Sequence, residues 1–181
     1  MLPVLNKHFT NLEVQKAQLL VNVKSWNLDQ LSFIPKENHW SILEVLLHIV
    51  KVDTGVTKYL RKYQSSISEQ KLGIGAWWRS LVLRSFLITP VMIKAPNVPG
   101  IRPSGDLDLS TINHDWDKSR IILSDYLNLF PEHLLDRYVF KHPLSGKFNI
   151  EQTLIFIYYH TLHHQHQLNR ITSHSEFPKQ V

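Results

Sequence analysis

The stretch Ile150–Thr172, with the sequence IEQTLIFIYYHTLHHQHQLNRIT, decides the fold of this 181-residue chain. Its apolar residues recur at intervals of three and four positions, as on one face of an α-helix. Asn149, directly before the stretch, is a residue type that often caps a helix N-terminus. The stretch therefore predicts a helix with a core face, and that helix also carries a cluster of four histidines: His160, His163, His164 and His166.

Other segments extend this pattern into a bundle. A shorter helix is expected over residues 73–93, followed by a loop over 94–105. A turn is expected over residues 141–147, and no alternating β pattern of useful length appears. The prediction is an all-α fold with one domain over residues 1–181. It is a four-helix bundle whose long crossover between helix 2 and helix 3 contains the extra short helix. Long helices are predicted, besides the one over 150–172, at about 4–26, 41–63 and 111–129.

Composition limits the chemistry that the chain can perform. It has no cysteine, which excludes disulfides, iron–sulfur clusters, thiolate metal ligands and a protein thiol nucleophile. It has 20 basic and 15 acidic residues, and the basic excess is concentrated in residues 51–94. We see no basic stripe with interleaved aromatics and no nucleic-acid-binding motif, so a nucleic-acid partner is not expected. The basic region is either a solvated face or part of a pocket for an acidic small molecule.

No segment of the sequence predicts export or membrane insertion. Residues 1–10 lack the apolar core of a signal peptide. The longest strongly apolar run without charge, Ser85–Ile93, is much shorter than the roughly 20 residues that span a bilayer. We therefore expect a cytoplasmic protein without a membrane partner.

Helical geometry separates the clustered histidines. At about 100° per residue, with His160 at zero, the core-like residues of this helix fall between about 20° and 120°. His164 lies at about 40°, inside that arc, and His160 lies at its edge. His163 and His166 fall at about 300° and 240° and are turned away. His160 and His164 therefore point inward together, one turn apart, at a spacing that lets two imidazoles share a metal.

His48 occupies a similar position on the helix predicted over 41–63, beside that helix's own core stripe. A bundle could bring the two edges together, and three neutral imidazoles would form a metal site with open positions. Alternatively, His48 is a lone core-edge histidine and the cluster is a polar seam. Gln167 faces the same edge as His160 and either contacts a ligand or lies on the surface. The remaining histidines are interpreted as surface or cap residues: His8, His39, His114, His133, His142 and His174.

Two motifs in these helices resemble a known family. The stretch 40–48, WSILEVLLH, resembles the W-S-x-x-E-x-x-x-H opening of the DinB/YfiT-like proteins of the DinB superfamily. The stretch 160–167, HTLHHQHQ, resembles their closing H-x-x-H-H-x-x-Q signature, and residues 142–148, HPLSGKF, are similar to a turn found in one branch. The region 71–105 is poorly matched, and nothing is inferred for it.

The resemblance implies a four-helix bundle, usually a homodimer, with a divalent metal held by His48, His160 and His164. Zinc or nickel is expected, with iron or manganese also compatible with these ligands. A metal ion with an open coordination position lowers the pKa of a water or thiol that binds to it there. The function expected is that of a metal-dependent enzyme: an S-transferase that uses a low-molecular-weight thiol such as bacillithiol or mycothiol, or a hydrolase. The alternative is a non-enzymatic, stress-related dimeric scaffold that binds metal.

Three further residues are candidates for the surroundings of the site, and no catalytic residue is assigned. Glu44 lies one turn before His48 and is either a general base or part of a capping box with Ser41. Tyr59 lies about three turns after His48 and either lines the pocket or belongs to the core. His163 is expected to support a ligand or to lie on the surface. The outward apolar strip of the last helix is expected to face another bundle neighbour or a dimer partner: Ile155, Tyr159 and Leu162.

Overall fold

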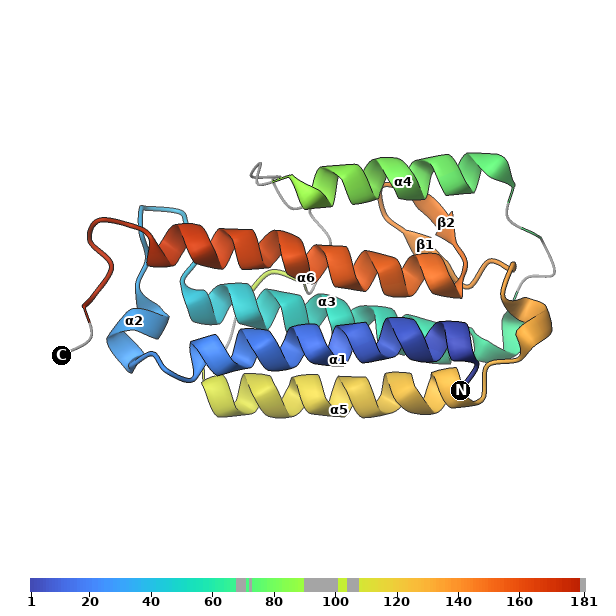
Figure 1. The fold of residues 1–181 in the computed structure, drawn as a ribbon, viewed down its shortest axis with the longest axis horizontal. Coiled ribbons are helices and arrows are strands. Elements are labelled where there is room, and N and C mark those ends of the chain that lie inside the picture. Colours follow the sequence, from blue (N-terminus) through green and yellow to red (C-terminus); the bar gives the residue numbers. More distant parts are fainter. Residues whose placement is uncertain (68–70, 72, 90–100, 104–107, 180–181) are drawn as a thin grey trace.

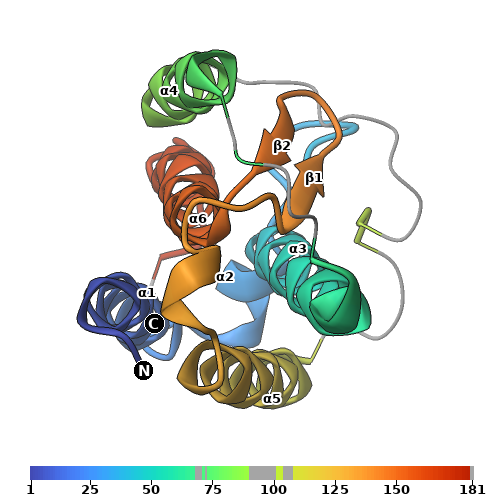
Figure 2. The ribbon, with the colours of Figure 1, turned by 90° about the vertical axis from the view of Figure 1, so that its right-hand side faces the viewer.

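Four long helices run side by side in the computed structural model, which describes residues 1–67, 71, 73–89, 101–103 and 108–179 (Figure 1). The end-on view places them at the four corners of a bundle, with α6 beside α1 and α3 beside α5 (Figure 2). This confirms the predicted four-helix bundle, and every predicted end lies within three residues of the observed one. None of the described helices is long and apolar enough to cross a membrane. The four are α1 (Pro3–Val23), α3 (Ile42–Lys62), α5 (Leu109–Asn128) and α6 (Ile150–Thr172).

Side-chain caps fix where the helices that carry the histidines begin. At α3, the Ser41 hydroxyl accepts a hydrogen bond from the Glu44 N–H, and the Glu44 carboxylate accepts one from the Ser41 N–H at 2.7 Å. At α6, Asn149 and Gln152 form the same reciprocal pair. The predicted capping box and N-cap are thus confirmed. A third pair begins α2 (Leu28–Ser32), a helix too short to show a period in the sequence.

The helix α4 (Ile74–Ile88) confirms the extra short helix predicted over residues 73–93, of which 90–93 lie outside the described residues. Most of the predicted loop over 94–105 lies outside them too. α4 packs along α6 on the outer side of the bundle (Figures 1 and 2). Its Arg84 guanidinium lies 4.7 Å from the ring centre of Tyr159, and Ile155 and Tyr159 line a small cavity with it. The outward apolar strip of α6 therefore faces α4 at Ile155 and Tyr159.

A short β-hairpin occupies the region where the sequence predicted only a turn. Its strands are β1 (Phe140–His142) and β2 (Gly146–Phe148), which pair antiparallel. The expectation of no strand was wrong because three-residue strands are too short to show an alternating pattern. Gly146 has a φ of 78°, the left-handed conformation that closes such a three-residue loop. Short 3₁₀ turns, η1 (Gln64–Ser66) and η2 (Glu132–Leu134), complete the described elements.

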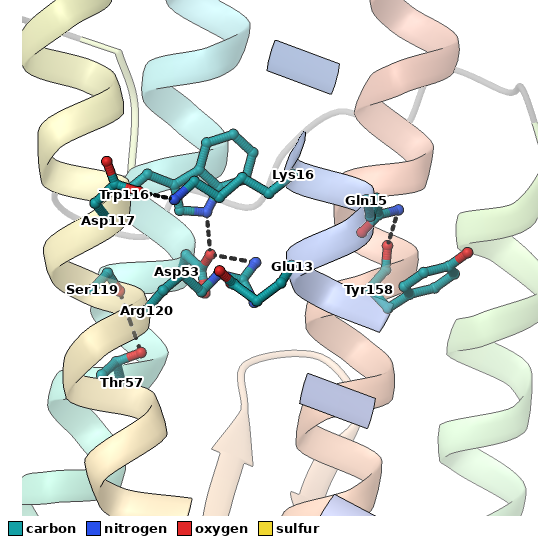
Figure 3. A network of polar contacts seen from close by, with 10 residues as sticks. All are labelled: Glu13, Gln15, Lys16, Asp53, Thr57, Trp116, Asp117, Ser119, Arg120 and Tyr158. Carbon is teal, nitrogen blue, oxygen red and sulfur yellow. Dashed lines mark hydrogen bonds and ion pairs between the residues drawn. The ribbon is translucent and has the colours of Figure 1, made fainter. Parts of the chain in front are cut away.

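The core divides into two apolar clusters along the bundle axis. One cluster contains Leu12 and Leu60, and the other contains Leu19 and Ile49. On α1 and on α3, buried polar residues lie between the members of the two clusters, so a polar layer separates them (Figure 3).

An ion pair between α3 and α5 forms the centre of this polar layer. Asp53 and Arg120 are each 2 % exposed, and a guanidinium nitrogen lies 2.9 Å from a carboxylate oxygen. The same oxygen accepts a hydrogen bond of 2.6 Å from the indole N–H of Trp116. Glu13 of α1 lies 3.7 Å from Arg120, and a second ion pair joins Lys16 to Asp117. Because buried charges are tolerated only when they are paired, this layer restricts how the helices align.

Candidate metal centre

Three histidines from two helices converge where α3 and α6 pack together. His48 comes from α3, and His160 and His164 lie one turn apart on α6. One ring nitrogen from each lies within 4.8 Å of the other two. The ring centres are 4.6 Å apart for the α6 pair, and His48 lies 5.2 Å from His160 and 4.7 Å from His164. The structure therefore brings together the three residues that the sequence singled out.

Hydrogen bonds orient two of these rings. The Nδ1 of His48 lies 2.7 Å from the carbonyl oxygen of Ile101, and the Nδ1 of His164 lies 2.9 Å from the side-chain oxygen of Gln167. A carbonyl oxygen only accepts, so each Nδ1 donates its N–H and each Nε2 keeps a lone pair. The Nε2 atoms of His160 and His164 lie 3.2 Å apart. An outer hydrogen bond that fixes the tautomer is the usual support of a metal-ligating histidine.

Burial keeps the three imidazoles in the neutral form. Desolvation lowers the pKa of His164 to about 3, and the positive charge that a protonated His48 would carry adds to this effect. Desolvation, followed by the neighbouring His164, also holds the pKa of His160 well below its ordinary value. It lowers the pKa of His48 as well, although the bond to Ile101 opposes the shift. Neutral imidazole is the form that binds metals, so the site is ready for one near neutral pH.

Two aromatic side chains pack against the histidines. The Trp40 ring centre lies 5.0 Å from that of His48, and it stacks on His164 at 6.5 Å with an interplanar angle of 25°. Phe156, one turn before His160, lies 5.6 Å from it. Trp40 directly precedes the N-cap Ser41, so the capping box that begins α3 also positions this ring. Trp40 is quoted in the sequence motif above but was not predicted to contact the site.

Two residues that the sequence left undecided lie against the cluster. Gln167 contacts His164, so the surface alternative is wrong for it. His163 is turned away from the bundle core, as predicted, but the residue is only 6 % exposed. The surface alternative fails here because α4 covers this face of α6, and the backbones of Leu87 and Thr89 interact with the ring. His163 also packs edge-on against His164, with ring centres 5.3 Å apart.

Two other candidates have roles outside the cluster. Glu44 is engaged in the capping box, which accounts for its position without a role as general base. The Tyr59 hydroxyl lies 2.9 Å from that of Tyr138, and its ring packs on Phe140. Eleven residues after His48, it is about 16 Å further along the helix axis, so the pocket-lining alternative is wrong. Burial and the Tyr138 contact raise the pKa of Tyr59 to about 12.

His142 lies close to the cluster, which the sequence did not indicate. It was interpreted as a surface or cap residue, yet it is 7 % exposed. Its Nδ1 accepts hydrogen bonds from the N–H groups of Leu144 and Ser145, so it does cap the hairpin turn. Burial lowers its pKa to about 4. Its ring contacts Phe156, which also contacts His160.

Comparison with known proteins agrees with this arrangement. The sequence model of the DinB superfamily matches residues 11–168. The chain belongs to the DinB superfamily. This DinB-superfamily chain is also similar to the crystal structure of TT2238, a four-helix bundle protein, with a TM-score of 0.57. The match covers 92 % of this chain and 98 % of that chain at 19 % sequence identity, which supports a shared fold alone. No curated protein matches the chain.

The donor set fits a divalent metal. Three neutral imidazoles with converging ring nitrogens suit zinc, nickel, iron or manganese to different degrees, and fewer than four protein ligands leave open positions. The chain is thus a DinB-superfamily member with a buried three-histidine cluster that could bind a divalent metal.

Proposed function

We propose that this protein is a metal-dependent enzyme that activates a low-molecular-weight thiol for transfer of its sulfur to an electrophilic carbon. His48, His160 and His164 would hold the metal, with zinc or nickel as the first candidates and iron or manganese as the others. The observation that carries the proposal is the convergence of three neutral, mostly buried imidazoles, two of which use Nδ1 for a hydrogen bond and so keep the Nε2 lone pair for a metal. The resemblance of the two histidine motifs supports the same ligand set.

The residues of the chain prepare the site in separate ways. Gln167 and the Ile101 carbonyl hold His164 and His48 in the required tautomer. Trp40 and Phe156 pack against His48 and His160, and this apolar contact would strengthen electrostatic interactions at the cluster by lowering the local dielectric constant. A bound divalent metal would lower the pKa of a coordinated thiol or water toward neutrality. The thiol proton would pass to solvent, and the sulfur would attack carbon as the leaving group departs with its electron pair.

Hydrolysis is the second candidate reaction, and one observation favours thiol transfer over it. The acidic residue of the motif is Glu44, one helical turn before His48. Its carboxylate accepts a hydrogen bond from the Ser41 N–H and is thus already engaged. Water attack benefits from a positioned general base. A thiol is more acidic than water and forms its anion near neutral pH without one.

An activity screen of the metal-loaded protein tests the proposal. Purified protein loaded with zinc or nickel is assayed with monochlorobimane and several cellular thiols, and in parallel with ester and amide substrates. We expect metal-dependent conjugation that disappears in His160→Ala and persists in His166→Ala, a substitution on the same helix outside the cluster. Full metal occupancy without turnover of any substrate would contradict the enzyme proposal. It would favour the non-enzymatic, stress-related metal-binding scaffold.

We also propose that the protein forms a homodimer in the cytoplasm. Support for the dimer comes from exposed Trp78, Val82 and Ile88, which lie within an arc of about 120° on α4. Light scattering after size exclusion should give twice the mass of the chain. A single-chain mass at every concentration would contradict the dimer, and cell fractionation tests the location.

A further inference from the structure

The three candidate ligands differ in what orients their rings. His48 and His164 each donate from Nδ1 to an oxygen outside the cluster. In the described part of the chain, the hydrogen-bond partner of His160 is instead the other ligand of α6, with the two Nε2 atoms 3.2 Å apart. A metal bound by both rings would replace that contact. Because the χ2 torsion of histidine has broad minima, packing must fix the ring of His160.

Phe156 supplies this packing from one turn earlier on α6. Its ring centre lies 5.6 Å from that of His160, with 47° between the ring planes. Phe156 is itself buried, and three rings of the β1–β2 hairpin pack against it: Phe140 at 6.2 Å, Phe148 at 6.4 Å and His142 at 4.6 Å. His142 is the nearest of the three and meets Phe156 edge-on, at 74°. The hairpin therefore reaches His160 through a single intervening side chain.

His142 is held firmly in this position. Its Nδ1 accepts the N–H groups of Leu144 at 3.2 Å and of Ser145 at 3.1 Å. Its ring stacks on Phe148 of the paired strand, at 5.5 Å and 24°. Gly146, which pairs with His142 across the hairpin, closes the turn in the left-handed conformation. A phenylalanine at position 142 would also fill this space, but it would take away the acceptor of both N–H groups.

These contacts form a continuous path from the hairpin turn to the cluster. We propose that His142 is a positioning residue of the candidate metal centre, and that it acts through the Phe156 ring to hold His160 in its ligating orientation. The inference rests on the metal site of the function proposed above and is independent of the reaction. A ligand whose rotamer is locked by packing loses less entropy when the metal binds. The turn over residues 142–148 thereby gains a role in metal binding.

Cobalt binding to the full-length protein tests this path with two variants. Phe156→Leu removes the ring that contacts His160. His142→Asn keeps a side-chain oxygen that can accept the N–H groups of the turn, but it removes the ring that packs on Phe156. Phe130→Leu is the matched control, because Phe130 is a buried ring of the same apolar cluster that packs on Tyr126. Circular dichroism and urea unfolding establish that each variant is folded before cobalt is added.

Two readouts separate positioning from a general loss of stability. Cobalt affinity is measured by competition with a chromophoric chelator, and the visible absorption of bound cobalt reports the geometry of its ligands. We expect Phe156→Leu and His142→Asn to change this absorption and to bind cobalt about tenfold more weakly than wild type, the lower end of the effect of losing a residue that supports a ligand. The control should lower the urea midpoint and leave affinity and absorption as in wild type.

The possible results distinguish the inference from the metal site on which it rests. Wild-type affinity and absorption in both variants, or equal changes in the Phe130→Leu control, would overturn the inference and leave the three-histidine centre standing. A change in Phe156→Leu alone would also overturn it, because His142 would then have no part in holding His160. A wild-type protein that binds no cobalt would instead overturn the metal centre and the proposed function with it.

Discussion

Replacing Asp53 by asparagine tests the buried polar layer that lies between the two apolar clusters. One carboxylate oxygen of Asp53 contacts both the Arg120 guanidinium at 2.9 Å and the Trp116 indole N–H at 2.6 Å. Asparagine keeps an acceptor for Trp116 but removes the charge that faces Arg120. Its amide NH₂ would take the place of the second carboxylate oxygen, which is buried and has no hydrogen-bond partner in the described part of the chain. A buried cation would thus lose its counter-charge.

The expected loss of stability follows from this geometry. Breaking a buried ion pair by removing one partner costs about 3–5 kcal/mol of unfolding free energy. Glu13, which lies 3.7 Å from Arg120 but is 41 % exposed, compensates only weakly. We therefore expect Asp53→Asn to lower the unfolding free energy by about 3 kcal/mol, the lower end of that range. Urea unfolding followed by circular dichroism measures this, with an unchanged m-value as the sign that the two end states are the same.

Making Asp53→Asn in an Arg120→Met variant as well as in wild type tests whether the loss of stability comes from the ion pair. In Arg120→Met, Asp53 is itself a buried charge without its partner, so adding Asp53→Asn should cost no stability or should raise the unfolding free energy. Equal losses in both backgrounds, or a loss below about 1 kcal/mol in wild type, would refute the assignment of the ion pair as the source of stability. Metal affinity should not change, because Asp53 and His48 face different sides of α3.

Further predictions concern the pH dependence of stability, the hydrogen bond from His164 to Gln167, and the N-terminal cap of α6. His142 and His164 have pKa values lowered to about 4 and 3, so below pH 6.5 the unfolded chain binds protons that the metal-free folded chain does not. Stability should fall as pH drops through this range, by about 2 kcal/mol per ring at pH 5, and equal urea midpoints at pH 7 and 5 would contradict this. Gln167→Leu should weaken metal binding by about 10–100-fold, whereas Gln165→Leu should not, and equal effects would exclude the proposed support of His164. Asn149→Ala should cost about 1 kcal/mol by loss of the α6 cap, and thermal unfolding that is indistinguishable from wild type would argue against the cap.

Helical period and capping chemistry were enough to predict the bundle and the ligand pair on α6. The signal is local: Ser41 and Asn149 mark helix starts, and His160 and His164 share one face at a spacing fixed by 3.6 residues per turn. Which edge of α3 would face them could not be calculated from periodicity alone. His48 was a candidate because it borders the core stripe of its own helix, and the fold supplies the contact.

Other features of the site depend on tertiary structure and have no local signature. The partner of His48 is a backbone carbonyl, which any residue at position 101 would provide. His163 looked exposed on a helical wheel because the wheel does not show that α4 covers that face of α6. Tyr59 shares its azimuth with His48, but azimuth ignores distance along the axis. The hairpin that buries His142 has strands too short for a period to emerge.

Metal binding by the purified protein tests the central claim most directly. Zinc and nickel affinities are measured by competition with a chromophoric chelator for wild type and for three ligand variants, His48→Ala, His160→Ala and His164→Ala. His166→Ala, on the same helix but outside the cluster, is the control. We expect one metal ion per chain in wild type and in the control. Each ligand variant should bind metal more than about a hundredfold more weakly than wild type. This exceeds the usual cost of losing a residue that only hydrogen-bonds to a ligand. A wild-type protein that binds neither metal, or a control that loses as much affinity as the ligand variants, would contradict the three-histidine centre.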